Sequence, residues 1–561
     1  MSVAQVTART PRVEFAARAL TRARPSLREL LIALVIFAVA GVAVFGSHVV
    51  DGSFYYDDWA NSARTHFAGD FGAQLSSYWD LTRWRPLLVV YVPALNSIFG
   101  THQHLFLAWS LLTAILATTA LFALLRTLGF ERLHAGLISL LTLVFPFADV
   151  TKFWATSSVT QVVIALYFIG LTVAVRGIDA PTRRSRVRHH AVALAFYAAS
   201  VALYETAATV ILASVLVYWW RASRGAGWRT GLRRALPRFG ADVVVVGALL
   251  VWNISQSQIT SSSESGGILE HVRLILDQGW RIIASAALPF GTPRTATVLV
   301  AAAAILAAGA LVAVLLRRVA DDDARRELWR WTATAGAGVL FAFVAWGVFA
   351  PAAAYYSPAT IGLGNRVNAV AAAGIVVAVY AVAMVAGTLV FRGLPRWRIW
   401  AAGLAAVAAI ALGIGYIQRV DADKTAWAAA TREQLHVERA VRQAVPRPPR
   451  GATLFTFGEP GWAASGVPIF AATWDLQGAV RVLYDDRTLD GQPVFGQMSM
   501  VCTAKGLYFN GPGYGPASAR PYGLAVLVDV PAGTAVRPMN RGQCQRAAGQ
   551  YPVGPYALPA T

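Results

Sequence analysis

The chain has 561 residues, of which 56% are hydrophobic and only 14% are charged, and its mean hydropathy is +0.50. This composition excludes an ordinary soluble globular protein, in which about a quarter of the residues are charged. The net charge of +20 does not indicate nucleic-acid binding, because the arginines form short clusters between apolar runs rather than one basic face. We therefore expect a multi-pass membrane protein that binds no nucleic acid.

The N-terminal segment, 1–29, is rich in arginine, and the apolar run that follows, 30–50, has roughly the 20 residues that cross a bilayer. No small-residue cleavage pattern precedes Asp51, so we interpret this run as a retained anchor rather than a signal peptide. Basic segments tend to remain cytoplasmic, so the chain should exit to the outer face here. The first outer loop, 51–103, is dense in aromatic residues, which predicts short amphipathic helices along the membrane surface.

Hydropathy predicts eleven spans in all, with the N-terminus cytoplasmic and the C-terminus extracytoplasmic. Lys and Arg collect in the segments placed inside, whereas the segments placed outside carry few of them, which supports this orientation. The apolar part of the first loop, 86–100, contains two prolines, and we interpret it as an interfacial or re-entrant segment. The transmembrane domain then covers 30–417. The expected spans are 30–50, 104–125, 133–149, 156–175, 190–205, 206–220, 240–255, 295–316, 332–350, 367–391 and 399–417.

Residues 418–561 should form a small extracytoplasmic domain. The β-like runs ATLFTF and LAVLVDV alternate with turns rich in Gly and Pro, which is typical of a mixed α/β module. The only two cysteines of the chain, Cys502 and Cys544, both lie in this segment. Because an outer compartment is oxidising, the two are candidates for a disulfide.

Ionisable side chains at membrane depth are usually functional or paired, so the few that the topology places near the outer face are candidates for a site. Asp57 and Asp58 are adjacent in the first loop, in YYDDW. Each candidate has a structural alternative, such as a solvated loop for the two acids or an interfacial position for the histidine. The other candidates are Arg83 and Arg85 in RWRPL, Asp149 and Lys152 in FPFADVTKFW, Glu205 in ALYETA, Arg366 in GLGNRVN, and His104 at the end of the loop.

The ordered set YYDDW, RWRPL with NSIFG, FPFADVTKFW and ALYETA resembles the GT-C superfamily of membrane glycosyltransferases. Within it, the motifs look most like the protein O-mannosyltransferase branch, which includes tetratricopeptide-containing enzymes. They cover about residues 30–220, and the later spans are similar in architecture only. This chain has no tetratricopeptide repeats, so the resemblance implies no particular acceptor. The separate outer domain looks more like the arrangement in actinobacterial cell-wall arabinosyl- and mannosyltransferases.

The resemblance implies a GT-C-like fold, a sugar donor carried on a polyprenyl phosphate, and a first-loop acid that acts as catalytic base or binds a metal. We take Asp58 as the first choice for the base and Asp57 as its partner or a metal ligand. Glycosyl transfer independently requires a base for the acceptor hydroxyl and positive charge for the departing phosphate. The remaining expectations are Arg366, Arg83 and Arg85 at the donor phosphate; Glu205, Lys152 and His104 at an acceptor or metal site; and a divalent cation, Mg or Mn, on Asp57 and Glu205.

We therefore expect an inverting hexosyl- or pentosyltransferase that acts on an extracytoplasmic cell-wall glycan, lipid or protein. A composition high in arginine and low in lysine points to the plasma membrane of a bacterium. The first alternative is a transporter or flippase for lipid-linked sugars, which would carry inverted repeats and paired charges near the bilayer midplane. The second is a non-catalytic membrane protein whose outer domain binds cell-envelope glycan, in which the first-loop acids would be dispensable.

Overall fold

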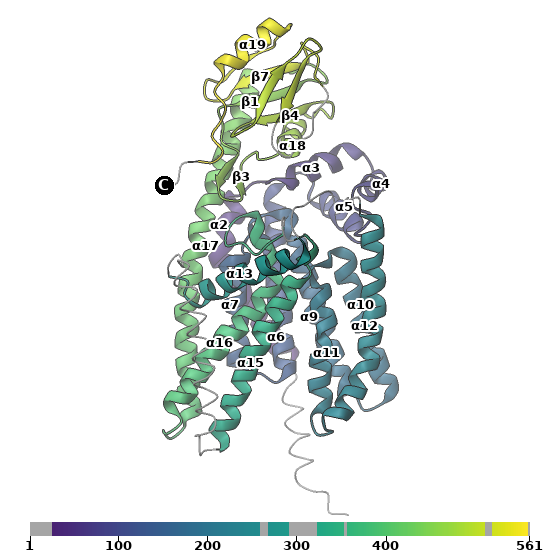
Figure 1. The fold of residues 1–561 in the computed structure, drawn as a ribbon, viewed down its shortest axis with the longest axis vertical. Helices are drawn as coiled ribbons and strands as arrows, with labels where there is room; N and C mark the ends of the chain where they lie inside the picture. Colours follow the sequence, from purple (N-terminus) through teal and green to yellow (C-terminus); the bar gives the residue numbers. More distant parts are fainter. Residues whose placement is uncertain (1–24, 258–266, 291–321, 353–355, 511–518, 559–561) are drawn as a thin grey trace, which may run out of the picture.

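The computed structural model describes residues 25–257, 267–290, 322–352, 356–510 and 519–558. A bundle of long helices makes up most of the molecule, and a small α/β domain stands on one end of it (Figure 1). The expected fold class, a helical multi-pass membrane protein with a small α/β C-terminal domain, is confirmed. The helices before that domain are α2 (Leu27–Asp51), α3 (Asp57–Ala68), α4 (Phe71–Thr82), α5 (Leu88–Phe99), α6 (Gln103–Leu128), α7 (Arg132–Leu143), α8 (Val150–Phe153), α9 (Ser158–Ile178), α10 (Arg183–Leu203), α11 (Ala208–Ser223), α12 (Trp228–Gln256), α13 (Ile268–Ala287), α15 (Asp322–Gly347), α16 (Ala369–Phe391) and α17 (Trp397–Ala444).

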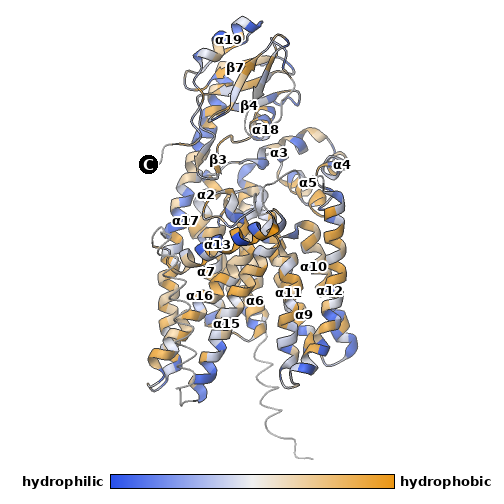
Figure 2. Cartoon of the chain, viewed as in Figure 1, coloured by the Kyte–Doolittle hydropathy of each residue, from blue (hydrophilic) through white to orange (hydrophobic). Residues whose placement is uncertain are grey.

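Seven of the described helices are long and apolar enough to cross a membrane, namely α2, α6, α12, α15, α17 and the helices that contain α9 and α16. Figure 2 shows hydrophobic residues along the bundle and hydrophilic residues at the helix ends away from the α/β domain. On α2, the side chains of Leu31, Val35 and Val39 are exposed, as a lipid-facing surface requires. The helix begins at a cap in which Ser26 Oγ accepts a hydrogen bond from Glu29 N (3.2 Å).

The remaining four of the eleven predicted spans differ from expectation or lie outside the described residues. The segment 133–149 was expected to span, but α7 has only 12 residues, about 18 Å of helix, and ends shortly before Pro146, which cannot continue it. The segments 190–205 and 206–220 become α10, whose first half is basic, and α11, which has 16 residues. The span expected at 295–316 lies outside the described residues.

The first outer loop forms the three short helices α3, α4 and α5, at the end of the bundle that faces the α/β domain (Figure 1). This confirms the prediction of short helices in the loop. The interfacial segment becomes α5, which has 12 residues and contains Pro93, so it is too short to cross. The loop is tied to α17, because the Tyr55 hydroxyl lies 2.6 Å from Thr431 Oγ1.

The helix α17 connects the bundle to the α/β domain without a break. Its 48 residues make it about 70 Å long, and position 418, the expected domain boundary, falls inside it. At its far end, Gln434 Nε2 donates a hydrogen bond to Ile469 O (2.7 Å), in the chain that leads to the next helix. The bundle and the outer domain therefore share one helix.

The C-terminal domain contains a four-stranded sheet in the order β4-β1-β7-β8, in which β1 runs parallel to β4 and β7 and β8 is antiparallel. The predicted runs ATLFTF and LAVLVDV form β1 and β7. Leu454 and Phe455 of β1 belong to different hydrophobic clusters, one shared with α18 and one with α19, because alternate residues of a strand face opposite sides. The elements are β1 (Thr453–Phe457), β2 (Trp462–Ala464), β3 (Val467–Pro468), α18 (Thr473–Tyr484), β4 (Asp490–Val494), β5 (Ser499–Cys502), β6 (Leu507–Asn510), β7 (Ala525–Asp529), β8 (Thr534–Val536) and α19 (Arg541–Gln550).

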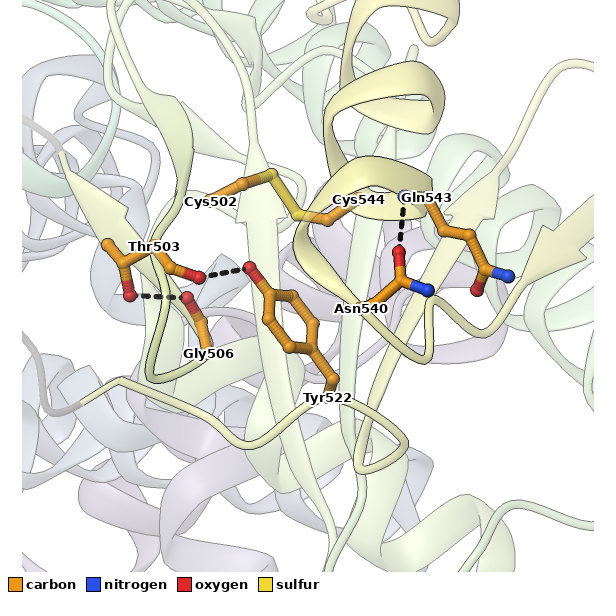
Figure 3. The surroundings of a disulfide bond; sticks show 7 residues. All are labelled: Cys502, Thr503, Gly506, Tyr522, Asn540, Gln543 and Cys544. Carbon is orange, nitrogen blue, oxygen red and sulfur yellow. Dashed lines mark hydrogen bonds between the residues drawn. A yellow bond between two sulfur atoms is a disulfide. The ribbon is translucent and has the colours of Figure 1, made fainter.

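A disulfide joins Cys502 on β5 to Cys544 on α19, with the two Cα atoms 6.0 Å apart (Figure 3). Beside it, Asn540 caps α19 by accepting a hydrogen bond from Gln543 N (3.0 Å). Such a bridge typically stabilises a domain by about 2–4 kcal/mol. It fastens the part of the domain that lies farthest from the bundle (Figure 1).

Candidate active site

The two acids of the first loop occupy the first turn of α3, directly after Tyr56. The φ angle of Tyr56 is 52°, a region that costs a non-glycine residue about 1–3 kcal/mol. Two aromatic rings pack against the side chain of Tyr56. The centre of its ring lies 5.2 Å from the ring centre of Trp474 on α18 and 6.2 Å from that of Trp154. The strained turn is thus held by aromatic packing from both the bundle and the outer domain.

Asp58 is closed off by hydrogen bonds from its own chain. Its side chain is buried, with Oδ1 accepting hydrogen bonds from Thr156 N (2.7 Å) and Thr156 Oγ1 (2.5 Å) and Oδ2 accepting one from Tyr55 N (3.1 Å). Burial raises the pKa of Asp58 to about 7, although these hydrogen bonds oppose the rise. Both oxygens are engaged, so Asp58 fastens the start of α3 to the turn that precedes α9.

Asp57 is open by comparison. It is partly exposed, and its Oδ1 accepts a hydrogen bond from Trp474 Nε1 (3.0 Å), whereas its Oδ2 has no hydrogen-bond partner among the described residues. Burial raises the pKa of Asp57, while the positive charge of Arg366 and the bond from Trp474 hold the rise back. A carboxylate with a free oxygen and a raised pKa can accept a proton from a hydroxyl group.

The outer domain packs closely over α3. A Cβ atom at Gly478 of α18 would lie 2.4 Å from the backbone of Trp59, so only glycine fits there. This close contact between α18 and α3 is what brings the Trp474 indole to Asp57.

Arg366 lies in the short helical turn Leu363–Asn368, just before α16. Its guanidinium stands 5.1 Å from the ring centre of Trp154 and 5.3 Å from that of Tyr356, and its Nη1 donates to Leu363 O (3.2 Å). Within the described part of the chain it forms no ion pair. Because a guanidinium has five N–H donors, most of them remain available for an anion.

Gly362, which precedes this turn, has a φ angle of 69° and lies against the backbone of Gly466, where a Cβ would come within 2.4 Å. Leu363 N also donates to Gly466 O (2.7 Å). The turn that carries Arg366 is therefore positioned by the outer domain as well as by α16.

Arg85 and Glu205 form a closed pair near the same surface. Arg85 Nε lies 2.9 Å from Glu205 Oε2 and Nη2 lies 2.6 Å from Oε1, while the guanidinium also covers the ring of Tyr204 at 4.1 Å. Asn253 adds a hydrogen bond to Glu205 Oε2 (3.3 Å). The nearby Arg83 offers only its backbone carbonyl, to Trp252 Nε1 (3.0 Å), and its buried Nε has no partner among the described residues.

The structure does not bring Lys152 and His104 to the aspartates. Lys152 is buried inside the bundle, where its Nζ lies 3.4 Å from Ala148 O and 5.2 Å from the ring centre of Phe45. His104 stands at the start of α6 with its Nδ1 3.1 Å from Val49 O. Asp149, predicted beside Lys152, accepts a hydrogen bond from Asn365 Nδ2 (2.7 Å) in the same interior region.

The two carboxylates that the sequence suggested as ligands of a divalent cation do not come together. Both oxygens of Glu205 are held by Arg85, so Glu205 and Asp57 do not form a shared carboxylate site. Across the described residues, no group of three or more His, Cys, Asp and Glu side chains is placed to hold a metal ion. Mg²⁺ is usually held by one or two carboxylates together with substrate phosphates and waters, and of the two predicted ligands only Asp57 keeps an open oxygen.

Sequence reasoning missed four residues that complete the site: Trp154, Thr156, Tyr356 and Trp474. Trp154 is the last residue of the motif FPFADVTKFW and Thr156 lies two positions after it, so their position beside an acidic turn was a usable signal. Trp474 lies 417 positions from Asp57 in a different domain, and no sequence pattern links the two. The site is thus built from the first loop, the turn before α9, the turn before α16, and α18.

No family model and no curated protein matches this chain. Among solved structures, it is similar to ArnT from Cupriavidus metallidurans in the apo state, with a TM-score of 0.41 and 14% identity over 75% of this chain and 81% of that chain. The same protein bound to undecaprenyl phosphate gives a TM-score of 0.35 and 14% identity over 75% and 82% of the two chains. At these TM-scores the likeness carries no inference about the chemistry of the site.

Proposed function

We propose that this protein is a membrane glycosyltransferase of GT-C type that moves a sugar from a polyprenyl-phosphate-linked donor to a hydroxyl group of an extracytoplasmic glycan, lipid or protein. One observation carries the proposal: the Trp154 ring packs both against Tyr56, which precedes the open carboxylate of Asp57, and against the guanidinium of Arg366, which has no ion pair in the described chain. The charge of Arg366 also opposes the rise in the pKa of Asp57. A base and an anion-binding group beside one another are the two groups that glycosyl transfer requires.

In the proposed reaction, Asp57 Oδ2 accepts the proton of the acceptor hydroxyl as the hydroxyl oxygen attacks the anomeric carbon of the donor sugar. The bond between that carbon and the phosphate oxygen breaks, and the electron pair leaves with the polyprenyl phosphate. A single displacement of this kind inverts the anomeric configuration. We assign the base to Asp57 rather than to Asp58, because both oxygens of Asp58 are already engaged.

Arg366 would bind the donor phosphate and stabilise the negative charge that develops on it, since its planar N–H groups can engage two phosphate oxygens at once. The partly exposed ring of Tyr356, over which Arg366 lies, offers an apolar face for the sugar, whereas the buried ring of Trp154 supports Arg366. Arg366 supplies the positive charge that a metal ion would otherwise supply.

Asp58 becomes a positioning residue, which holds the start of α3 against Thr156, and the Arg85–Glu205 pair holds the surrounding loops together. The site lies at the end of the bundle that carries the outer domain, opposite the ends rich in hydrophilic residues (Figure 2). If the basic ends are cytoplasmic, the site faces outward, where a lipid carrier delivers the sugar. We place the protein in the plasma membrane of a bacterium.

The test is transfer of radiolabelled sugar from a panel of polyprenyl-phosphate donors by the full chain in nanodiscs. We expect one donor to be used by the wild type and by Asp80→Asn, a matched control because Asp80 is an exposed acid of the same loop. Asp57→Asn should lose transfer. Full activity of Asp57→Asn would overturn the assignment of the base. Movement of the labelled lipid across proteoliposome membranes with no transfer from any donor would overturn the proposed function and favour a flippase.

A further inference from the structure

The three helices of the first outer loop enclose a second cavity, of about 200 Å³, on the side of α3 that carries Ser62. A single water needs only about 10–15 Å³ of such space, so this cavity is large enough for a small organic ligand. Its side chains come from α3, α4 and the end of α5, and two glycines complete the wall. The lining side chains are Ser62, Thr65, His66, Gln74, Asn96 and Thr101.

The chemistry of the lining is polar but uncharged. It consists of hydroxyl and amide groups and the imidazole of His66, and it contains no Asp, Glu, Lys or Arg. Hydroxyls and amides both donate and accept hydrogen bonds, as the hydroxyls of a sugar do. A phosphate, a carboxylate or an ammonium group would find no opposite charge in this pocket, so the lining favours a neutral ligand rich in hydroxyl groups.

A buried hydroxyl without a partner marks this pocket as incomplete. Ser62 is only 2% exposed, and its Oγ has no hydrogen-bond partner among the described residues. The neighbouring Thr65, by contrast, donates to Asn61 O (2.9 Å). A buried polar group that stays unpaired is unfavourable, and a ligand hydroxyl in the pocket would pair it.

The pocket lies next to a smaller cavity that borders the buried acid of α3. A smaller cavity of about 30 Å³ shares Ser62 and Asn96 with it and reaches Asp58 and Thr156. At another point of the lining, His66 Nε2 lies 2.8 Å from Asp485 Oδ1, at the end of α18. The pocket thus lies between the acids of α3 and a contact with the outer domain.

We infer that this pocket is a binding subsite for one uncharged sugar unit. The further assignment, that this unit belongs to a glycan acceptor, rests on the proposed function. The subsite holds a sugar unit of the glycan on the Asp58 side of α3, while the hydroxyl that reacts is presented to Asp57. The acceptor class is therefore a neutral glycan rather than a protein or an anionic lipid.

The test measures binding of methyl α-mannopyranoside, methyl α-glucopyranoside and methyl α-arabinofuranoside to the full chain in nanodiscs, without any donor, by saturation-transfer NMR titration. Methyl glucuronide, which carries a carboxylate, is the charged comparison. We expect at least one neutral glycoside to bind, and Ser62→Ala to weaken its binding about tenfold, the effect of losing one hydrogen bond to a buried hydroxyl.

Ser139→Ala is the matched control. Ser139 is also fully buried and its Oγ also lacks a partner among the described residues, but it lies on α7, away from the pocket. Both substitutions remove an unpaired hydroxyl, so both should leave the melting temperature equal to or above that of the wild type. Of the two serine variants, only Ser62→Ala should weaken glycoside binding. Asn96→Leu, which changes a lining residue on α5, should weaken it as well.

The inference is overturned if no neutral glycoside binds, if Ser62→Ala and Ser139→Ala bind equally well, or if the charged glycoside binds more tightly than the neutral ones. Because the assay contains no donor, its outcome is separate from that of the transfer assay. Glycoside binding that depends on Ser62 in a protein that transfers no sugar would support the pocket and overturn the proposed function. Sugar transfer by a protein that binds no neutral glycoside would support the proposed function and overturn the sugar subsite.

Discussion

Two acid–arginine sets lie at the same end of this molecule, and they differ in whether their hydrogen-bonding capacity is already used. Arg85 and Glu205 close on each other with two hydrogen bonds of 2.9 and 2.6 Å. The charge of Arg366 opposes the rise in the pKa of Asp57, but the two form no ion pair, and each is held by other groups instead. Both sets combine a carboxylate with a guanidinium, so the difference lies mainly in the contacts.

The contacts of the closed pair are those of a structural element. The pair joins the segment between α4 and α5 to the turn between α10 and α11, and Asn253 adds α12. The open set joins α3, the turn before α16, and α18 of the outer domain. We conclude that an acid beside an arginine indicates a reactive site only where an oxygen and several N–H groups remain free.

The largest expected effect separates Asp57 from Asp58. Asp57→Asn should lower the rate of transfer by about 10²–10⁴-fold, the usual contribution of a general base, without a change in melting temperature. Asp58→Asn should instead lower the free energy of unfolding by about 1–3 kcal/mol, because it places an amide group against three donors. Transfer assays and thermal unfolding of the two variants measure this. Equal losses of stability in both would remove the distinction between them.

The second effect concerns the closed pair. Glu205→Gln should lower the free energy of unfolding by about 1.5–3 kcal/mol, since it weakens the charged hydrogen bonds of Arg85, and both side chains are only 22% exposed. Denaturant unfolding of Arg85→Gln, Glu205→Gln and the double variant gives the coupling between the two residues. A Glu205→Gln variant that is fully stable but inactive would contradict a structural role.

The third effect is a shift in pH dependence. The proposed base must be ionised, so kcat/KM should rise with pH as Asp57 loses its proton, along a limb set by its raised pKa. The charge of Arg366 lowers that pKa, so Arg366→Gln should move the limb to higher pH and also raise the KM for the donor. Arg366→Lys, which keeps the charge, should leave the limb in place. If the pH dependence of kcat/KM does not shift in Arg366→Gln, the charge of Arg366 does not affect the pKa of Asp57.

The smallest effect tests the contribution of the outer domain. Trp474→Phe removes the N–H group that bonds to Asp57 Oδ1 but keeps the ring that packs on Tyr56. Transfer should fall by about 2–10-fold, the range for one hydrogen bond. Trp79→Phe, an exposed tryptophan of α4, is the control and should have wild-type activity. An unchanged rate in Trp474→Phe would show that the domain only covers the site.

Hydropathy located most of the helices because long apolar runs have few alternatives in a membrane, and it located β1 and β7 because short β-branched and aromatic runs between turns are distinctive. Hydropathy wrongly predicted a membrane span at 133–149, because an average over the segment does not register the helix break that Pro146 imposes. The disulfide candidates were simple to name because the chain has only two cysteines.

The acidic motif could be located from the sequence, but the different environments of its two acids could not. Neighbouring residues on a helix point about 100° apart, so one of them can face the interior while the other faces an opening. Which one does so depends on Thr156 and Trp474, which belong to distant segments. In the same way, only the fold reveals that Glu205 is already bound to Arg85, 120 positions away.

Because α17 runs without a break, it fixes both the rotation and the height of the outer domain relative to the bundle. A helix without a break has a rotational phase, so every residue inserted or deleted between Trp397 and Gln434 would turn the domain by about 100° and raise or lower it by about 1.5 Å. Trp474 would then no longer meet Asp57. The number of residues in α17 therefore sets the height and the rotation of the α/β domain on the helix bundle, and with them the position of Trp474 over α3.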